Sequence, residues 1–385
     1  MTDLDRIRTD VVGSLLRPAA WKEARARMER NELSVHEFAA VELECVKRHL
    51  ALQESIGLDV VTDGEVGRLN FQDSFGLSVS GYDTGSEGLG QRMGQHERRV
   101  AGGTPLARFD MPDLARAGTP VVHRRPVAKK LNLERNLPLE EYRRAAPIAK
   151  KPVKVSLIGP DRIAQRFDHQ GSKNVYESVD EFVEDVVALQ AQMIRQLVDA
   201  GCRYVHIDEP GYTAYVDAPS LEAMRARGED PQANFSRSLC ANARLVAGFP
   251  GVTFGIHLCR GNQRSMWHRE GSYDAIAERL FNELPHQRFL LEYDSPRAGS
   301  FAPLRFVPTG KIVVLGLVST KVPELESLDE LRRRVDEAAK YVPLEQLAVS
   351  PQCGFGSDVV GNLVSEDDQK RKLERVVELA RKVWA

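Results

Sequence analysis

Short runs of apolar, often β-branched residues recur along the chain, and longer segments with helical periodicity separate them. Such runs are typical of buried strands, and their alternation with helices predicts parallel strands covered by helices. Eight runs favour a closed (β/α)8 TIM barrel, although open doubly wound sheets alternate in the same way. The predicted strands are 9–14, 58–65, 153–160, 203–210, 252–259, 288–295, 311–319 and 347–354.

Three of the predicted helices open with the capping-box pattern, in which Ser is followed three residues later by Glu. In this pattern the Ser side chain accepts a hydrogen bond from the backbone N–H of the Glu. The pairs are Ser34 with Glu37, Ser178 with Glu181, and Ser327 with Glu330. A further helix is expected after Ser365, at the end of the chain.

Residues 75–150 interrupt the alternation, because they are rich in Gly, Arg and Pro and have weak periodicity. A barrel accepts a long insertion after its second strand, and loops of this length are usually functional. We therefore predict one barrel domain over 1–385, with an inserted lid or partner-contact region at 75–150. A disordered excursion is the alternative interpretation.

Composition narrows the classes of function. The 385 residues are 42% hydrophobic and carry a formal net charge of -2, so a large core is expected and no basic field points to nucleic acid. No apolar run approaches the ~20 residues of a membrane span, and the charged start lacks a signal-peptide pattern. Five cysteines are few and odd in number, which indicates a reducing compartment. We expect a cytoplasmic protein, and we leave a homo-oligomer open.

Polar residues stand at the carboxyl ends of six predicted strands. In a barrel these ends share one rim, and that rim holds the active site. The clusters are Gly13-Ser14, Asp63-Gly64-Glu65, Asp208-Glu209-Pro210, His257-Leu258-Cys259, Glu292-Tyr293-Asp294 and Gln352-Cys353-Gly354.

One subset of these residues suits a metal. His257 and Cys259 are two apart on a strand, so both side chains face the same side. Cys353 and Glu292 come from other strand ends, and together they make an N/S/O set suited to tetrahedral zinc. The His-x-Cys pair alone is more often core packing. The second cysteine, in a turn-like P-Q-C-G stretch, favours zinc.

The carboxylates at the rim need cationic partners, because an unpaired buried charge is costly. Asp208 or Glu65 could receive a ligand ammonium group, or either could pair with an arginine of the chain. Ser14 offers a hydroxyl and a backbone N–H to an anionic group. Four arginines near this rim could also receive an anionic group, but rim arginines are usually solvated, and we expect the same here: Arg17, Arg68, Arg260 and Arg297.

With these motifs, from "VVGSLLRP" to "SPQCGFG", the chain resembles the catalytic barrel of cobalamin-independent methionine synthases, and especially their single-barrel members. The resemblance implies Zn2+ as cofactor and assigns roles by position. It implies that Asp208 and Glu65 are the catalytic residues, that Asp208 holds the substrate amine, and that Ser14 and Glu65 bind the amino-acid substrate. It also implies that His257, Cys259, Glu292 and Cys353 bind the metal.

Two departures from the family concern the methyl donor. The family histidine after the seventh strand is replaced in "GLVSTK", where Val318 takes its place. The tryptophan that stacks on folate is absent from "LIGPDRIAQRF". Another residue must then protonate the leaving atom, and the candidates are Glu209, Tyr212 and His268.

The resemblance implies a zinc-dependent thiol alkyltransferase whose partners are a small-molecule thiol and an alkyl donor. The leading prediction is methyl transfer from a methyltetrahydrofolate-type donor to homocysteine, which gives methionine. The alternative is alkylation of a zinc-bound thiol, as in epoxyalkane:coenzyme M transferases. A zinc-free barrel enzyme of the uroporphyrinogen decarboxylase type and a zinc- or thiol-binding protein without turnover are further hypotheses.

Overall fold

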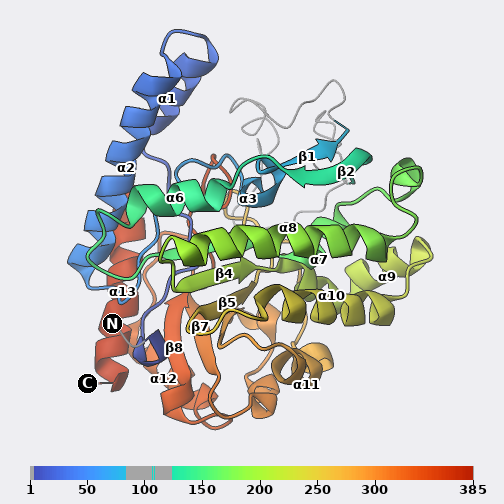
Figure 1. Ribbon diagram of the computed structural model, residues 1–385. Coiled ribbons are helices and arrows are strands. Elements are labelled where there is room, and N and C mark those ends of the chain that lie inside the picture. The colour runs from blue at the N-terminus through green and yellow to red at the C-terminus, as the bar shows by residue number, and fades with distance from the viewer. Residues whose placement is uncertain (1–3, 84–105, 107, 109–123, 385) are drawn as a thin grey trace.

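The protein has an α/β fold that is built on a parallel sheet of six strands (Figure 1). The computed structural model describes residues 4–83, 106, 108 and 124–384. The strands neighbour one another in chain order, which confirms the third to eighth predicted strands as a parallel sheet. They are β3 (Lys154–Ile158), β4 (Tyr204–Asp208), β5 (Thr253–Leu258), β6 (Arg288–Glu292), β7 (Ile312–Val318) and β8 (Leu347–Pro351).

The first two predicted strands form single bridges rather than regular strands. Thr9 bridges Val349 of β8, and Val61 bridges Val153 beside β3, both in parallel orientation. A side chain there accepts a hydrogen bond that a neighbouring strand would accept in a regular sheet: the carboxylate of Asp59 accepts the backbone N–H of Thr9 at 2.9 Å. These segments therefore lie along the two edges of the six-stranded sheet, and closure into an eight-stranded barrel stays a prediction.

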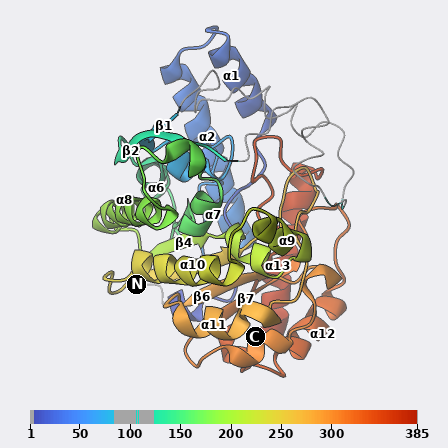
Figure 2. The same cartoon turned by 90° about the vertical axis from the view of Figure 1, so that its right-hand side faces the viewer.

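Helices cover the sheet, and α1 and α2 project together beyond it in both views (Figures 1 and 2). The helices are α1 (Ala19–Glu29), α2 (Val35–Ile56), α3 (Asp73–Gly76), α6 (Leu137–Ala145), α7 (Pro160–Gln165), α8 (Val179–Asp199), α9 (Ala218–Ala226), α10 (Pro231–Val246), α11 (Asp274–Glu283), α12 (Leu328–Ala338) and α13 (Glu366–Trp384). Short 3-10 turns lie at Leu4–Arg6, Gln170–Ser172, Pro210–Tyr215, Pro296–Ala298, Ala302–Phe306 and Leu344–Gln346. Within the described ranges, none of these helices has the length and apolarity of a membrane span.

The three predicted helix starts are confirmed, and in two of them the Ser side chain makes the expected capping hydrogen bond. The side chain of Ser34 accepts the N–H of Glu37 at 3.2 Å, and Glu37 accepts the N–H of Ser34 in return at 2.9 Å. The side chain of Ser178 caps α8 by accepting the N–H of Glu181 at 3.1 Å. The prediction for Ser327 is wrong in its contact: α12 begins there, but the Ser327 side chain makes no capping hydrogen bond.

Part of the predicted insertion belongs to the folded body. Within 75–150, β1 (Val79–Tyr82) pairs antiparallel with β2 (Val127–Leu133), and α6 follows them. Most of the remaining insertion, residues 84–105, 107 and 109–123, lies outside the described residues. The predicted lid or partner-contact role therefore stays a prediction, as does the single-domain boundary of 1–385.

A buried charge network joins the N-terminal segment to the amino ends of the strands. The carboxylate of Asp10 accepts hydrogen bonds from Lys154 at 2.7 Å, Tyr204 at 2.7 Å and Arg288 at 3.1 Å. Burial alone would raise the pKa of Asp10, but the charges of Lys154 and Arg288 outweigh burial and lower it. The resulting stabilisation is present above the ordinary carboxyl pKa and is lost as pH falls through the lowered value.

We expect Asp10→Ala to destabilise the fold by about 3–5 kcal/mol, because Lys154 and Arg288 would stay buried without their carboxylate. Chemical denaturation at neutral pH measures the free energy of unfolding. The control is Asp329→Ala, which removes an exposed carboxylate paired with Lys382 and should leave stability unchanged. Equal stability of the Asp10 variant and the wild type would contradict the structural role of the network.

Candidate metal centre

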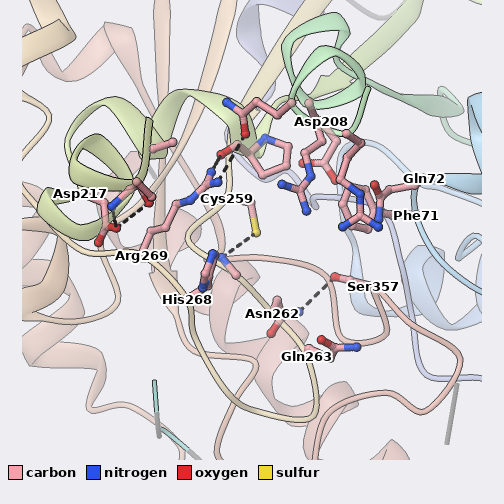
Figure 3. A pocket seen from close by; sticks show the side chains of 18 of the residues that line it. Phe71, Gln72, Asp208, Asp217, Cys259, Asn262, Gln263, His268, Arg269 and Ser357 are labelled. Atoms are coloured by element: carbon pink, nitrogen blue, oxygen red, sulfur yellow. Dashed lines mark hydrogen bonds between the residues drawn. The ribbon is translucent and has the colours of Figure 1, made fainter. Parts of the chain in front are cut away.

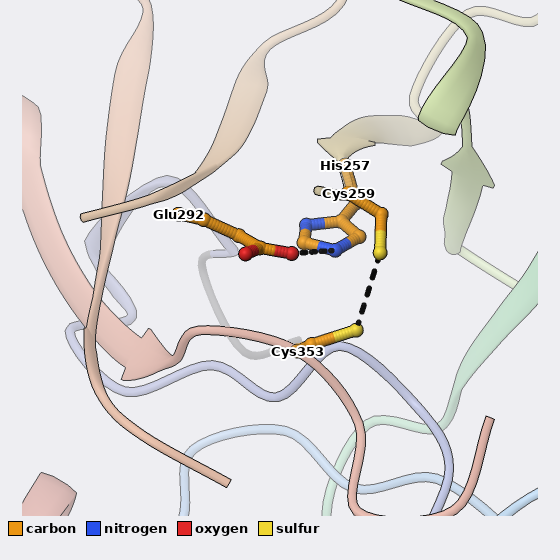
Figure 4. A group of neighbouring side chains, drawn as sticks. All are labelled: His257, Cys259, Glu292 and Cys353. Carbon is orange, nitrogen blue, oxygen red and sulfur yellow. Dashed lines mark hydrogen bonds and ion pairs between the residues drawn. The ribbon is translucent and has the colours of Figure 1, made fainter. Parts of the chain in front are cut away.

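Four metal-ligand side chains converge at the carboxyl ends of three strands (Figure 4). Their ligand atoms all lie within 4.8 Å of one another, and all four residues are buried. The Sγ atoms of Cys259 and Cys353 are 3.6 Å apart, and Nε2 of His257 is 3.8 Å from Oε1 of Glu292. The structure thus brings together the four residues that the sequence grouped.

Backbone groups orient these side chains toward a common point. Nδ1 of His257 donates to the carbonyl of Leu290 at 3.1 Å, which leaves Nε2 as the ring nitrogen on the side of Glu292. Oε1 of Glu292 accepts the N–H of Arg260 at 2.8 Å. Sγ of Cys259 accepts the N–H of Gly261 at 3.3 Å. Such contacts hold metal ligands in place before a metal arrives.

The electrostatics of the cluster call for an added cation. Burial raises the pKa of Glu292 to about 7, and Cys353 adds to the rise. Burial alone would lower the pKa of His257, but Cys353, Asp208 and Glu292 raise it to about 9. The Cys259 thiol stabilises the Cys353 thiolate, which lowers the pKa of Cys353 and raises that of Cys259. Protons on His257 and Cys259 therefore offset the charge of the Cys353 thiolate, and a cation would take the place of these protons.

The donor set fits a metal ion. Nε2 of His257 and Oε2 of Glu292 are buried and form no hydrogen bond with any described residue. A buried polar atom without a partner is costly, and a cation among these atoms would remove that cost. One imidazole, two thiols and one carboxylate are the ligand types and number that zinc takes.

Asp208 lies beside the metal centre and faces a cavity. It ends β4, pairs in register with His257 of β5, and lines a cavity of about 440 Å³ that Cys259 also lines (Figure 3). Burial raises the pKa of Asp208 to about 7. Its Oδ1 is buried without a hydrogen bond to the described part of the chain. This carboxylate can therefore receive a cationic ligand group.

Glu65 is held in a strained turn after the second predicted strand. Its backbone has a φ of 54°, and its Oε1 accepts the hydroxyl of Ser156 at 2.6 Å. A Cβ atom on Gly13 would come 2.5 Å from this Oε1, so only glycine allows the approach. Arg68 lies 3.7 Å from Oε1 of Glu65 and already supplies one cation. Oε2 of Glu65 has no hydrogen-bond partner among the described residues.

Ser14 lies against the loop that carries Cys353. A Cβ atom on Gly354 would come 2.0 Å from Oγ of Ser14, and the N–H of Phe355 donates to the Ser14 carbonyl at 2.9 Å. The structure therefore places Ser14 close to the metal-centre loop. Its predicted role in substrate binding, like those of Asp208 and Glu65, stays a prediction.

The expectation of solvated rim arginines is wrong for Arg17, Arg68 and Arg260, whose exposed fractions are 4%, 1% and 1%. Arg17 donates to the carbonyls of residues 15, 65, 68 and 356, and Arg68 makes two hydrogen bonds to Glu141. Arg260 lies over the ring of Tyr273, 4.3 Å from its centroid. Carbonyls and an acid from α6, which sequence spacing does not reveal, compensate these charges.

The three candidate proton donors have different surroundings. His268 lines the cavity. Glu209 is fully buried, and its carboxylate accepts the N–H groups of Asp161 and Arg162, each at 2.9 Å. Tyr212 is also fully buried, and its hydroxyl accepts a hydrogen bond from Asn242 at 3.1 Å. Of the three, only His268 is among the described residues that line the cavity.

Lys321 is a site residue that the sequence reasoning missed. Its Nζ donates to the carbonyls of Gly261 and Met266 and to the side chain of Asn262, at 2.8, 3.2 and 2.7 Å. It thereby holds the loop that follows Cys259. The only sequence signal was its place two residues beyond Ser319 in "GLVSTK", just after the end of β7.

Comparisons with known proteins agree with this geometry. A family model described as the catalytic domain of cobalamin-independent synthase matches residues 7–101 and 293–381. YxjH of Bacillus subtilis, named as uncharacterized, is 33% identical and covers 98% of this chain and 94% of its own length. A methionine synthase from Pyrococcus abyssi is 22% identical, over 92% of this chain and 87% of its own.

A solved structure supports the same fold. The B12-independent methionine synthase from Shewanella sp. W3-18-1, in complex with selenomethionine, matches with a TM-score of 0.69 at 16% identity. The match covers 98% of this chain and 97% of that one. With the family model and the full-length relative, it places the α/β fold among known catalytic domains. The chain belongs to the cobalamin-independent methionine synthase family.

Proposed function

We propose that this protein is a zinc-dependent methyltransferase that moves a methyl group from a methyltetrahydrofolate-type donor to homocysteine, giving methionine. The observation that carries the proposal is the cluster of His257, Cys259, Glu292 and Cys353 at the edge of the cavity that Asp208 lines. The name of the Pyrococcus abyssi relative supports the reaction, and the selenomethionine complex of the Shewanella protein supports the product class.

Zinc would be held by the four residues of the cluster. A thiol of pKa about 8.5 is mostly protonated at neutral pH, and a bound zinc ion would hold it as the nucleophilic thiolate. Glu292 is the ligand that we expect to exchange for the substrate sulfur, because a carboxylate is harder than a thiolate. We also infer that the two bridging segments, 9–14 and 58–65, complete a closed barrel around this centre.

The residues around the centre position the amino-acid end of homocysteine. Asp208 would accept the ammonium group through its unpaired Oδ1, and Glu65 would assist through Oε2. Ser14 would donate to the carboxylate. A thiol without an ammonium group, such as coenzyme M, would leave Asp208 unpaired, which counts against the epoxide-type reaction.

Methyl transfer needs one proton at the leaving atom. The S–C bond forms as the C–N bond of the donor breaks, and the leaving nitrogen takes a proton. Val318 ends β7 and cannot supply one. His268 lines the cavity, so we infer that it delivers this proton.

A donor competition tests the reaction. Zinc-loaded protein is offered homocysteine or coenzyme M, each with methyltetrahydrofolate in mono- and polyglutamate forms or with a short epoxide. We expect methionine from homocysteine and a folate, because Asp208 and Glu65 suit an amino acid. Product from epoxide and coenzyme M alone would overturn the methyltransferase while leaving the zinc–thiolate chemistry in place.

The amine role of Asp208 is tested by a matched pair of thiols. Homocysteine and 4-mercaptobutyrate differ only in the amino group. We expect Asp208→Asn to weaken homocysteine binding about tenfold or more, since a charged hydrogen bond is worth roughly 1.5–3 kcal/mol. Binding of 4-mercaptobutyrate, measured by calorimetry on the same zinc-loaded protein, should change little. Equal losses for both thiols would contradict an amine contact.

Metal analysis tests the centre itself. We expect about one zinc per chain in protein purified without chelators. Cys259→Ser and Cys353→Ser should each lose most of the metal, whereas Cys240→Ser, at an exposed free cysteine, should keep it. Glu292→Gln should keep more zinc than either cysteine variant. Trace zinc in the wild type, or metal loss from the Cys240 variant alone, would refute the assignment.

A further inference from the structure

The cavity beside the metal centre has a strongly basic lining. Arginines outnumber aspartates six to three in it, and no lysine or glutamate is among the described lining residues. The aspartates are Asp208, Asp217 and Asp358, and the arginines are Arg108, Arg124, Arg162, Arg166, Arg227 and Arg269.

Half of these arginines have carboxylate partners. Arg108 contacts both oxygens of Asp217, at 3.1 and 3.2 Å. Arg124 and Arg227 share the carboxylate of Glu229, at 2.5 and 2.8 Å. The charge of this outer part of the lining is therefore largely neutralised. At Glu229, however, one carboxylate faces the two guanidinium groups of Arg124 and Arg227, so one positive charge is left over.

Arg162 and Arg269 differ, because neither forms an ion pair within the described part of the chain. Arg269 is 7% exposed and donates to neutral acceptors, the carbonyl of Pro210 and, at 3.4 Å, the side chain of Gln165. Nε of Arg162 and Nε of Arg269 are buried and have no hydrogen-bond partner there. Two guanidinium groups thus line the cavity without an ion-pair contact to a described residue, although the charges of Asp161 and Glu209 act on them from nearby.

These two cations repel each other. Burial lowers the pKa of Arg162, and burial together with the charge of Arg162 lowers that of Arg269 to about 10. The charge of Glu209 acts most strongly to raise the pKa of Arg162, followed by those of Cys259, Asp161 and Asp208. Arg162 and Arg269, which we call the basic wall, therefore lie near the end of the cavity that Cys259 lines. Arg269 extends toward this end from the loop after β5 (Figure 3).

We propose that Arg162 and Arg269 bind an oxyanion group, a carboxylate, phosphate or sulfonate, on the molecule that donates the methyl group. This inference rests on the proposed function for the identity of that molecule. A cavity of about 440 Å³ has room for a drug-sized ligand beside a small thiol. Guanidinium groups hold carboxylate and phosphate through paired hydrogen bonds, which strengthen in a dry site.

The position of Arg162 in the sequence agrees with this assignment. It lies in the first turn of α7, directly after β3, and lines the cavity. Glu209 accepts the backbone N–H of Arg162 at 2.9 Å and so fixes the start of α7.

Anion binding without turnover tests the inference. Inorganic phosphate, methanesulfonate and glutarate are titrated by calorimetry into zinc-loaded protein at low salt. Arg162→Gln and Arg269→Gln should each weaken binding of the preferred anion about tenfold or more. Arg269→Lys should lose less, since it keeps the charge. The control is Arg244→Gln, at an exposed arginine paired with Glu184, which should bind as the wild type does.

The outcomes separate this inference from the proposed function. The anion that binds most tightly identifies the donor group as carboxylate, phosphate or sulfonate. Anion affinity that is equal in the wild type and in both Gln variants, with unchanged thermal unfolding, would overturn the inference. If the anion displaced bound homocysteine, the two arginines would belong to the homocysteine site, and their assignment to the methyl donor would be overturned. Arginine-dependent anion binding without any methyl transfer would refute the proposed function alone.

Discussion

The parallel register of β4, β5 and β6 is the constraint on which the site depends. It sets Asp208 beside His257, and His257 beside Leu290, whose carbonyl fixes the imidazole. A slip of one residue in β5 would turn His257 to the opposite face and away from Cys353. Parallel strands that are hydrogen-bonded on both sides do not slip easily. The sheet can therefore keep the ligand side chains close together, although their charges would otherwise drive them apart.

The two ends of the sheet treat buried charge in opposite ways. At the amino ends, the carboxylate of Asp10 accepts hydrogen bonds from Lys154, Tyr204 and Arg288, and these contacts serve the fold. At the carboxyl ends, His257 Nε2 and Glu292 Oε2 lack partners among the described residues. The same low-dielectric interior that makes the first network stabilising makes the second one a receptor for a cation.

The cavity has a polarity that suits two substrates. Its inner end has the Cys259 thiol and the carboxylate of Asp208, which suit a cation and an amino group. Arg162 and Arg269 form a basic wall beside this end and lack a carboxylate partner in the described chain. Charge alone would then orient a thiol amino acid and an anionic donor toward each other, and this orientation lowers the entropic cost of their reaction.

The sequence by itself determined the strand–helix alternation, six of the strands and the four donors that meet at the metal centre. Those features follow from local periodicity and from the rule that parallel strands end at one edge. It could not determine that Arg17, Arg68 and Arg260 are buried, because their partners are carbonyls, Glu141 and Tyr273 from distant segments. That His268 lines the cavity, whereas Glu209 and Tyr212 are buried away from its described lining, also depended on tertiary structure. Burial and charge compensation arise from packing between segments, which no local pattern encodes.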